Sequence, residues 1–146
     1  MHQNNKSIIN IPLLRLKYTD EEIKFIQDGV KDILKSGYLT MGSKVKEFEE
    51  EFSNFIGSKY AVAVNSGTSS LEIPLRALGV YNKTIIVPTI TFMATPLAVI
   101  HAGAKVIFVD VIPENLSIDP DDLKRKIKSD TAGVILVHIG GIISPY

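Results

Sequence analysis

The stretch between residues 59 and 137 most constrains the fold, because short apolar runs alternate there with segments of helical spacing. The apolar runs lack the polar alternation of a half-exposed strand and occupy residues 61–64, 84–87, 106–109 and 133–137. Helices are expected between them, at about residues 69–78, 93–101 and 120–128. This series predicts an α/β fold, a mostly parallel sheet with helices on both faces.

Two amphipathic helices are expected ahead of this stretch. Thr19 and Glu22 form a capping-box pattern, after which apolar residues recur at helical spacing until Gly37. A second helix follows Ser43 and ends at Gly57. We therefore divide the chain into an amino-terminal helical segment, residues 1–58, and the first half of an α/β domain, residues 59–146.

The turn at residues 65–70 concentrates small hydrogen-bond donors between an expected strand and an expected helix. The first amides of a helix lack intrahelical partners and carry partial positive charge, so this turn can bind a phosphate group. Gly67 permits close approach, and Thr68 and Ser69 add hydroxyl donors. An alternative remains open, because Ser69 and Glu72 also match an ordinary capping box.

A second segment that follows a strand, residues 89–92, is expected near the same crevice. Ligands in α/β sheets bind at the carboxyl ends of the strands. Pro74 conflicts with this plan, because it falls beyond the first turn of the expected helix. A proline in that position costs about 3 kcal/mol unless the helix begins late or bends.

Composition excludes several classes of function. The chain has 146 residues with 16 basic and 16 acidic side chains, so no strong field directs it to nucleic acid or to an anionic membrane. It has no cysteine, and its three histidines lie far apart, which predicts no metal site. No apolar stretch is long enough to span a bilayer, and we expect a cytoplasmic protein.

The remaining polar residues fit structural roles. His138 is expected to be a hydrogen-bonded histidine at a strand end, and Asp110 a strand-end cap or turn residue. Asp119, Asp121 and Asp122 are most simply explained as helix capping, with Pro120 at the first helical position. The chain ends soon after an apolar strand, so we expect the domain to be incomplete.

Taken in order, seven motifs resemble the amino-terminal part of the DegT/DnrJ/StrS-type aminotransferases, which make amino sugars with pyridoxal 5'-phosphate (PLP). The resemblance covers nearly all of residues 11–141, and the motifs read SGYLTMG (36–42), VKEFEEEF (45–52), AVAVNSGTSS (61–70), IVPTITFMAT (86–95), AGAKVIFVD (102–110), IDP (118–120) and VHIGG (137–141). The resemblance implies part of the large domain of a PLP-dependent aminotransferase of fold type I.

The resemblance also implies roles for individual residues. Gly67, Thr68 and Ser69 match the turn that holds the cofactor phosphate. Phe92 matches the aromatic residue that lies against the pyridine ring, and plain core packing is the alternative for it. Thr40 matches a loop near the substrate. The lysine that holds PLP covalently and the aspartate that pairs with the pyridine nitrogen are not in this chain, so no catalytic residue is assigned.

The implied activity is transfer of an amino group from a donor such as glutamate to a nucleotide-linked keto sugar, in amino-sugar and cell-surface polysaccharide biosynthesis. The complete protein would be a homodimer, and this chain is expected to be inactive alone. Two alternatives stay open: a dehydratase of the same family that uses pyridoxamine 5'-phosphate (PMP), and a non-catalytic fragment with an exposed Phe or Ile surface. A Rossmann-like nucleotide-binding domain is disfavoured, because the full glycine fingerprint and its acidic ribose partner are missing.

Overall fold

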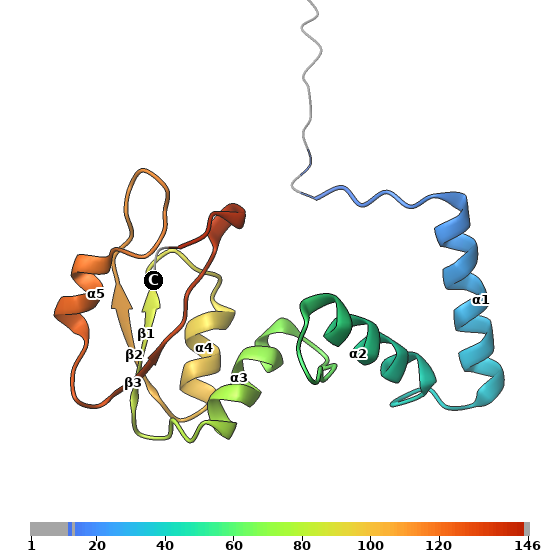
Figure 1. Ribbon diagram of the computed structural model, residues 1–146, viewed down its shortest axis with the longest axis horizontal. Coiled ribbons are helices and arrows are strands. Elements are labelled where there is room, and N and C mark those ends of the chain that lie inside the picture. The colour runs from blue at the N-terminus through green and yellow to red at the C-terminus, as the bar shows by residue number, and fades with distance from the viewer. Residues whose placement is uncertain (1–11, 13, 145–146) are drawn as a thin grey trace, which may run out of the picture. The chain divides into compact units, whose positions relative to one another are not determined.

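The computed structural model describes residue 12 and residues 14–144, and the chain divides into two compact units (Figure 1). The first unit comprises residues 1–63 and the second residues 64–146. The boundary expected after residue 58 stays a prediction. In the described part of the chain, no helix combines the length and the apolarity needed to cross a membrane.

The first unit contains α1 (Asp20–Ser36) and α2 (Ser43–Ile56). The expected capping box of α1 is confirmed: Glu22 N donates to Thr19 Oγ1 at 3.2 Å, and Thr19 N donates to Glu22 Oε2 at 2.7 Å. Gly37 and Gly57 end the two helices in the left-handed region, with φ of 72° and 76°. Neither helix contains a buried residue, so the apolar face of each remains exposed.

The second unit is built on a parallel sheet of three strands in the order β2-β1-β3. The central strand β1 (Thr84–Pro88) is buried at all five positions and pairs with β2 (Lys105–Val109) in register. It pairs on its other side with β3 (Thr131–Val134), with one register irregularity next to Thr84. The expected parallel sheet is therefore confirmed.

Two expected strands differ from the structure. Residues 61–64 form no strand, because no other strand of the described chain lies beside them to complete a ladder. The strand expected at residues 133–137 begins and ends earlier, as β3. Ile135 N still donates to Ile86 O at 2.9 Å, but the next bond of the ladder would need an N–H group on Pro88, and proline has none.

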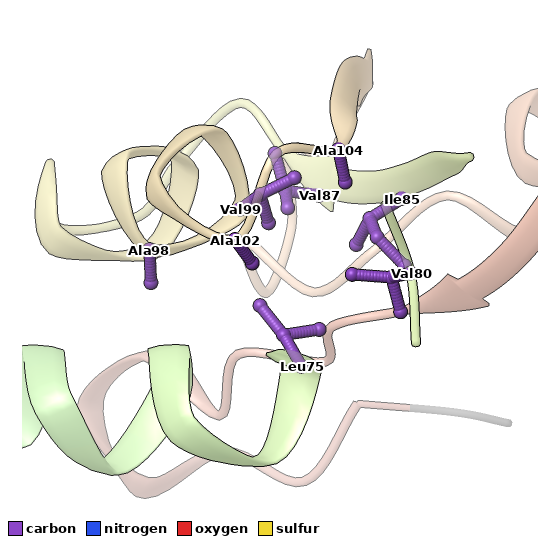
Figure 2. Close-up of a cluster of buried hydrophobic side chains, with 8 residues drawn as sticks. All are labelled: Leu75, Val80, Ile85, Val87, Ala98, Val99, Ala102 and Ala104. Carbon is purple, nitrogen blue, oxygen red and sulfur yellow. The ribbon is translucent and has the colours of Figure 1, made fainter. Parts of the chain in front are cut away.

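Helices cover both faces of the sheet, as expected. Ile85 and Val87 of β1 point to one face, where they pack in a cluster with residues of α3 (Gly67–Ala77) and α4 (Ala94–His101) (Figure 2). Ile86 points to the opposite face and packs with Leu123 of α5 (Pro120–Lys126). This alternation follows from the two-residue repeat of a strand.

The three helices of this unit match the expected ones to within two residues at each end. Asp119 caps α5, because its Oδ1 accepts the Asp121 amide at 2.9 Å. Pro74 lies inside α3, which begins at Gly67 and not later. The carbonyl of Ser70 therefore lacks the intrahelical donor that a residue other than proline would supply.

Candidate functional site

The amino terminus of α3 presents two amides without an acceptor. Ser66 caps the helix: its Oγ accepts the Ser69 amide at 3.1 Å, and its carbonyl accepts the Ser70 amide at 3.0 Å. The amides of Gly67 and Thr68 have no partner within residues 12 and 14–144. The alternative of a capping box formed by Ser69 and Glu72 is therefore wrong, because the cap is Ser66, three residues earlier.

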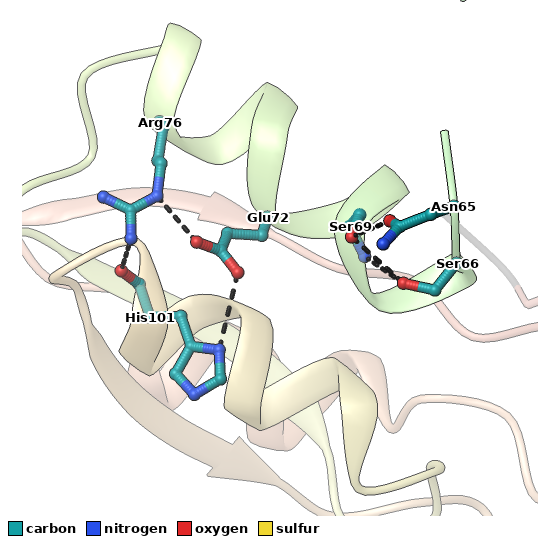
Figure 3. A network of polar contacts seen from close by, with 6 residues as sticks. All are labelled: Asn65, Ser66, Ser69, Glu72, Arg76 and His101. Carbon is teal, nitrogen blue, oxygen red and sulfur yellow. Dashed lines mark hydrogen bonds and ion pairs between the residues drawn. The ribbon is translucent and has the colours of Figure 1, made fainter. Parts of the chain in front are cut away.

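Ser69 contributes to this terminus through an ordered hydroxyl. Its Oγ donates to Asn65 Oδ1 at 2.7 Å and lies 3.0 Å from Ser66 Oγ (Figure 3). The Ser69 amide and hydroxyl are thus both used within the turn. The donors that remain for an anion are the Gly67 and Thr68 amides and the Thr68 hydroxyl.

Gly67 is not required by the protein itself. Its φ lies outside the left-handed region, and a Cβ atom added to it would meet no heavy atom within 4 Å. Neither backbone conformation nor packing therefore explains a glycine in the first turn of a helix. An anion can approach a helix amide closely only where the adjacent residue is small and the space next to the amide is empty.

Phe92 lies on the segment between β1 and α4 and is 81% exposed. The alternative of plain core packing is therefore wrong. Hydrogen bonds hold this segment: Thr95 N donates to Phe92 O at 2.9 Å, and the Thr91 and Thr95 hydroxyls lie 2.8 Å apart. Phe92 is an exposed aromatic ring on an ordered backbone at the carboxyl end of the central strand.

A polar cluster joins the carboxyl-terminal ends of α3 and α4. Glu72 accepts a hydrogen bond from Arg76 Nε at 2.7 Å and lies 3.4 Å from His101 Nδ1, while Arg76 Nη2 donates to the His101 carbonyl (Figure 3). The Arg76 hydrogen bond is the main reason that the pKa of Glu72 is lowered. Sequence spacing identified none of this cluster, although Glu72 and Arg76 have the i, i+4 spacing of a helical ion pair.

This cluster also fixes the direction of the two helices. Its contacts join Glu72 and Arg76, in the middle and last turn of α3, to His101 at the end of α4, and Figure 3 shows that α3 and α4 run in the same direction. The amino terminus of α3 and the amino terminus of α4 therefore open toward the same side of the unit. Phe92 lies two residues before α4, so the predicted phosphate-binding turn and the predicted ring-binding residue share this side.

At the carboxyl end of β2, a buried carboxylate holds the backbone. Asp122 accepts the Asp110 amide at 2.8 Å and hydrogen bonds from Lys126 at 2.7 Å and Arg125 at 3.0 Å. The pKa of Asp122 is lowered to about 2. The main cause is the hydrogen bond from Lys126, and the next is the hydrogen bond from the Asp110 amide. Helix capping, the simplest explanation from the sequence, is wrong for Asp122, because its side chain accepts the backbone amide of Asp110, twelve residues away at the end of β2.

The other polar residues lie as follows. Asp110 accepts the Val111 amide at 2.8 Å, which confirms it as a turn residue at a strand end. His138 accepts the Ser144 amide on Nδ1 at 3.0 Å, so it is hydrogen-bonded as expected. Thr40 is exposed in the loop between α1 and α2, and its role near the substrate stays a prediction. Within the described residues, no three acidic or histidine side chains are placed to hold a metal ion.

Comparison with known proteins gives a family for this arrangement. Residues 20–145 match the DegT/DnrJ/EryC1/StrS aminotransferase family. The spore coat polysaccharide biosynthesis protein SpsC of Bacillus subtilis (strain 168) is 42% identical over 113 residues, which are 77% of this chain and 29% of that protein.

Solved structures resemble the chain in three dimensions. The crystal structure of ntda from Bacillus subtilis with bound cofactor PMP has a TM-score of 0.84 and 32% identity, over 96% of this chain and 33% of that one. A GDP-4-keto-6-deoxymannose-3-dehydratase with a trapped PLP-glutamate geminal diamine has a TM-score of 0.77 and 33% identity, over 88% and 34%. The chain thus spans about a third of the length of the proteins that it matches.

Proposed function

Because the chain belongs to the DegT/DnrJ/EryC1/StrS aminotransferase family, we propose that it supplies the phosphate-binding turn and one ring-binding face of a PLP site in a sugar aminotransferase. Structures of related proteins hold PLP or PMP. The proposal assigns the phosphate to the turn of Gly67, Thr68 and Ser69, in which Gly67 and Thr68 supply the donors and Ser69 orders the turn, and the pyridine ring to Phe92.

The observation that carries the proposal is Gly67: the space that a side chain would fill there is empty, and its amide and that of Thr68 have no acceptor in the part of the chain that the structure describes. The two amides and the Thr68 hydroxyl would bind phosphate oxygens, aided by the partial positive charge of the helix terminus. Ser69 would order the turn through Asn65 and Ser66. These residues fit a phosphate group without any lysine or arginine.

Phe92 would complete the site by holding the ring. An aromatic contact contributes about 0.5–1.5 kcal/mol beyond burial, which orients a ring but does not retain it alone. The cofactor, when bound, stabilises carbanionic charge on the substrate. The residues of this chain would bind and orient it, and Thr40 would lie on the substrate side.

The proposed substrates follow from the names of related proteins. The related dehydratase acts on a GDP-linked keto sugar and was trapped with glutamate, and SpsC belongs to polysaccharide biosynthesis. We therefore propose a nucleotide-linked keto sugar as acceptor and glutamate as amino donor, in a cytoplasmic enzyme that is a homodimer when complete. The family resemblance implies that the cofactor-binding lysine lies outside residues 1–146, so we propose that these residues alone do not turn over.

A second candidate is a PMP-dependent sugar dehydratase, which is favoured by the structural similarity to such an enzyme. Both candidates use the same phosphate-binding turn, and the residue that separates them is the one in the position of the lysine. A non-catalytic fragment is the third candidate. It would share the fold and lack any requirement for a cofactor.

Ligand titration tests the proposal. PMP is the preferred probe because, unlike PLP, it has no aldehyde that reacts with surface lysines. We expect the chain to bind PMP, measured by cofactor fluorescence, at least about tenfold more tightly than pyridoxamine, since each phosphate contact adds a charge-assisted hydrogen bond. Equal affinities for the two compounds would show that the turn binds no phosphate.

A turnover assay tests the assignment of the reaction. The chain is mixed with PLP and glutamate, and formation of 2-oxoglutarate is followed. We expect none above the rate of PLP alone. Turnover by this chain would mean that one of its own lysines performs the role assigned to the missing one.

A further inference from the structure

The segment after β3 is closed into a loop by one buried serine. Ser144 is fully buried, and its hydroxyl donates to the Val137 carbonyl at 3.0 Å. Its amide donates to Nδ1 of His138, also at 3.0 Å. Ser144 therefore holds both the backbone and the side chain at the start of the loop, and the imidazole ring of His138 has a fixed position.

The Ser144 bond also fixes where the imidazole carries its hydrogen atom. A backbone amide can only donate, so Nδ1 must accept and must lack a hydrogen. The hydrogen of the ring is then on Nε2, which becomes a donor. Within residues 12 and 14–144, Nε2 has no hydrogen-bond partner, and the residue is exposed.

His138 lies at the edge of the sheet where the proposed site is. Ile86 of β1 pairs with Val134, and the Ile135 amide continues the ladder, so His138 falls beyond the level at which β1 ends. Phe92 follows the end of β1 at the same edge. Figure 1 shows the loop at residues 138–144 and the segment at residues 89–93 at the same end of the sheet.

We propose that His138 donates a hydrogen bond from Nε2 to an oxygen atom of the bound cofactor, and that Ser144 is the positioning residue that orients the ring. The α3 terminus supplies amides and Phe92 supplies a ring face, which carries no donor. His138 adds a directed donor at the same edge. This inference rests on the proposed function.

Two substitutions distinguish the donor role of His138 Nε2 from the acceptor role of His138 Nδ1. His138→Asn keeps an oxygen near the position of Nδ1 and loses the donor at Nε2. His138→Gln keeps an amide donor near the position of Nε2 and loses the acceptor for the Ser144 amide. We expect affinity for PMP to fall about tenfold in His138→Asn and by less in His138→Gln, as for the loss of one hydrogen bond to a charged ligand.

Thermal stability is expected to follow the opposite order. His138→Gln leaves the buried Ser144 amide unpaired and should melt at a lower temperature than His138→Asn. If His138 had a purely structural role, the variant with the lower melting temperature would also bind PMP more weakly. The proposal is supported if His138→Asn binds PMP more weakly while His138→Gln melts at the lower temperature. Parallel rankings, or a PMP affinity unchanged in His138→Asn, would overturn it.

Nitrogen NMR of the imidazole ring tests the tautomer without any ligand. We expect a hydrogen on Nε2 and none on Nδ1, and a hydrogen on Nδ1 would contradict the inference. Failure of the wild-type chain to bind PMP more tightly than pyridoxamine would remove the proposed function and the inference with it. Wild-type binding with an unaffected His138→Asn variant would remove the inference alone.

Discussion

The ring of Tyr81 lies against Gly103, so that a Cβ atom on Gly103 would come within 2.5 Å of Tyr81 Cδ2. Gly103 adopts a φ of 78° in the turn between α4 and β2, and its carbonyl accepts the Asn82 amide at 2.9 Å. The turn before β1 and the turn before β2 are therefore packed on each other. This contact sets where the two neighbouring strands begin.

Replacement of Gly103 by alanine should destabilise the second unit. The variant combines a left-handed backbone with a clash against a ring, and we expect a loss of about 1–3 kcal/mol in the free energy of unfolding, measured in urea. Gly79→Ala is the matched control, because Gly79 has a φ of 67° and no atom within 4 Å of an added Cβ. Equal losses in both variants would show that the Tyr81 contact contributes nothing.

Gly67→Ala should separate ligand binding from stability. The alanine meets no protein atom, so the free energy of unfolding should stay the same or rise by up to about 1 kcal/mol. Its methyl group would occupy the space next to the free amides, and affinity for PMP should fall at least about tenfold. Fluorescence titration and urea unfolding of the same preparation give both quantities. An alanine variant that binds PMP as tightly as the wild type would contradict the assignment of this turn.

Phe92→Ala should weaken PMP binding without unfolding the chain. The ring is 81% exposed, so its removal leaves no cavity, and the melting temperature should not change. Loss of the aromatic contact should lower affinity by about threefold to tenfold. Phe92→Tyr keeps the ring and serves as the control. A lower melting temperature in Phe92→Ala would indicate that Phe92 has a packing role after all.

Asp122→Asn should reduce stability in a way that depends on pH. The pKa of Asp122 is lowered from 3.8 to about 2, so its stabilising contribution is fully present above pH 3.8 and is lost as the pH falls toward 2. The variant should be less stable than the wild type at pH 7, and the difference should shrink between about pH 4 and pH 2. Asp121→Asn is the control, because Asp121 is exposed and 3.7 Å from Lys124. A difference that is constant across this pH range would exclude the ionised carboxylate as its cause.

Glu72→Gln should loosen the contact between α3 and α4. The substitution removes the carboxylate charge that pairs with Arg76 and that lies 3.4 Å from His101 Nδ1. Amide hydrogen exchange at residues 98–104, around the end of α4, should become faster than in the wild type. Asp28→Asn, which breaks the exposed pair with Lys24 on α1, should leave exchange at these residues unchanged. Unchanged exchange in Glu72→Gln would show that the cluster does not hold the helices together.

Sequence reasoning succeeded where the determinants are local. The capping box at Thr19 and the cap at Asp119 each act within one helical turn, and the apolar run at residues 84–87 is buried in the sheet as expected. The run at residues 106–109 forms the expected strand but is not the buried strand that was expected: Val109 is buried, whereas Phe108 is 46% exposed, because β2 lies at the edge of the three-stranded sheet. It failed where a partner is distant. Residues 61–64 have the composition of a strand, but a strand needs a neighbour, and composition does not supply one.

The candidate site shows the same division. The small residues at 65–70 were enough to predict the helix terminus. The sequence did not show that Ser66 is the cap, nor that the amides of Gly67 and Thr68 have no acceptor within residues 12 and 14–144. The contacts of Asp122 with Asp110 and of Glu72 with His101 span twelve and 29 positions in the sequence. Contacts of that length depend on how the helices pack against the sheet, which no local pattern encodes.

The segment at residues 61–64, which joins no strand within residues 12 and 14–144, affects how the protein behaves in solution. The Ala63 amide donates to Glu49 Oε1 at 2.8 Å, but Val62 is 79% exposed, and a short apolar stretch outside a sheet is a template for β-type association. Concentrated preparations should form intermolecular cross-β contacts first at this segment. Replacing Val62 with lysine should delay turbidity during storage, because a charge on an open edge opposes strand addition.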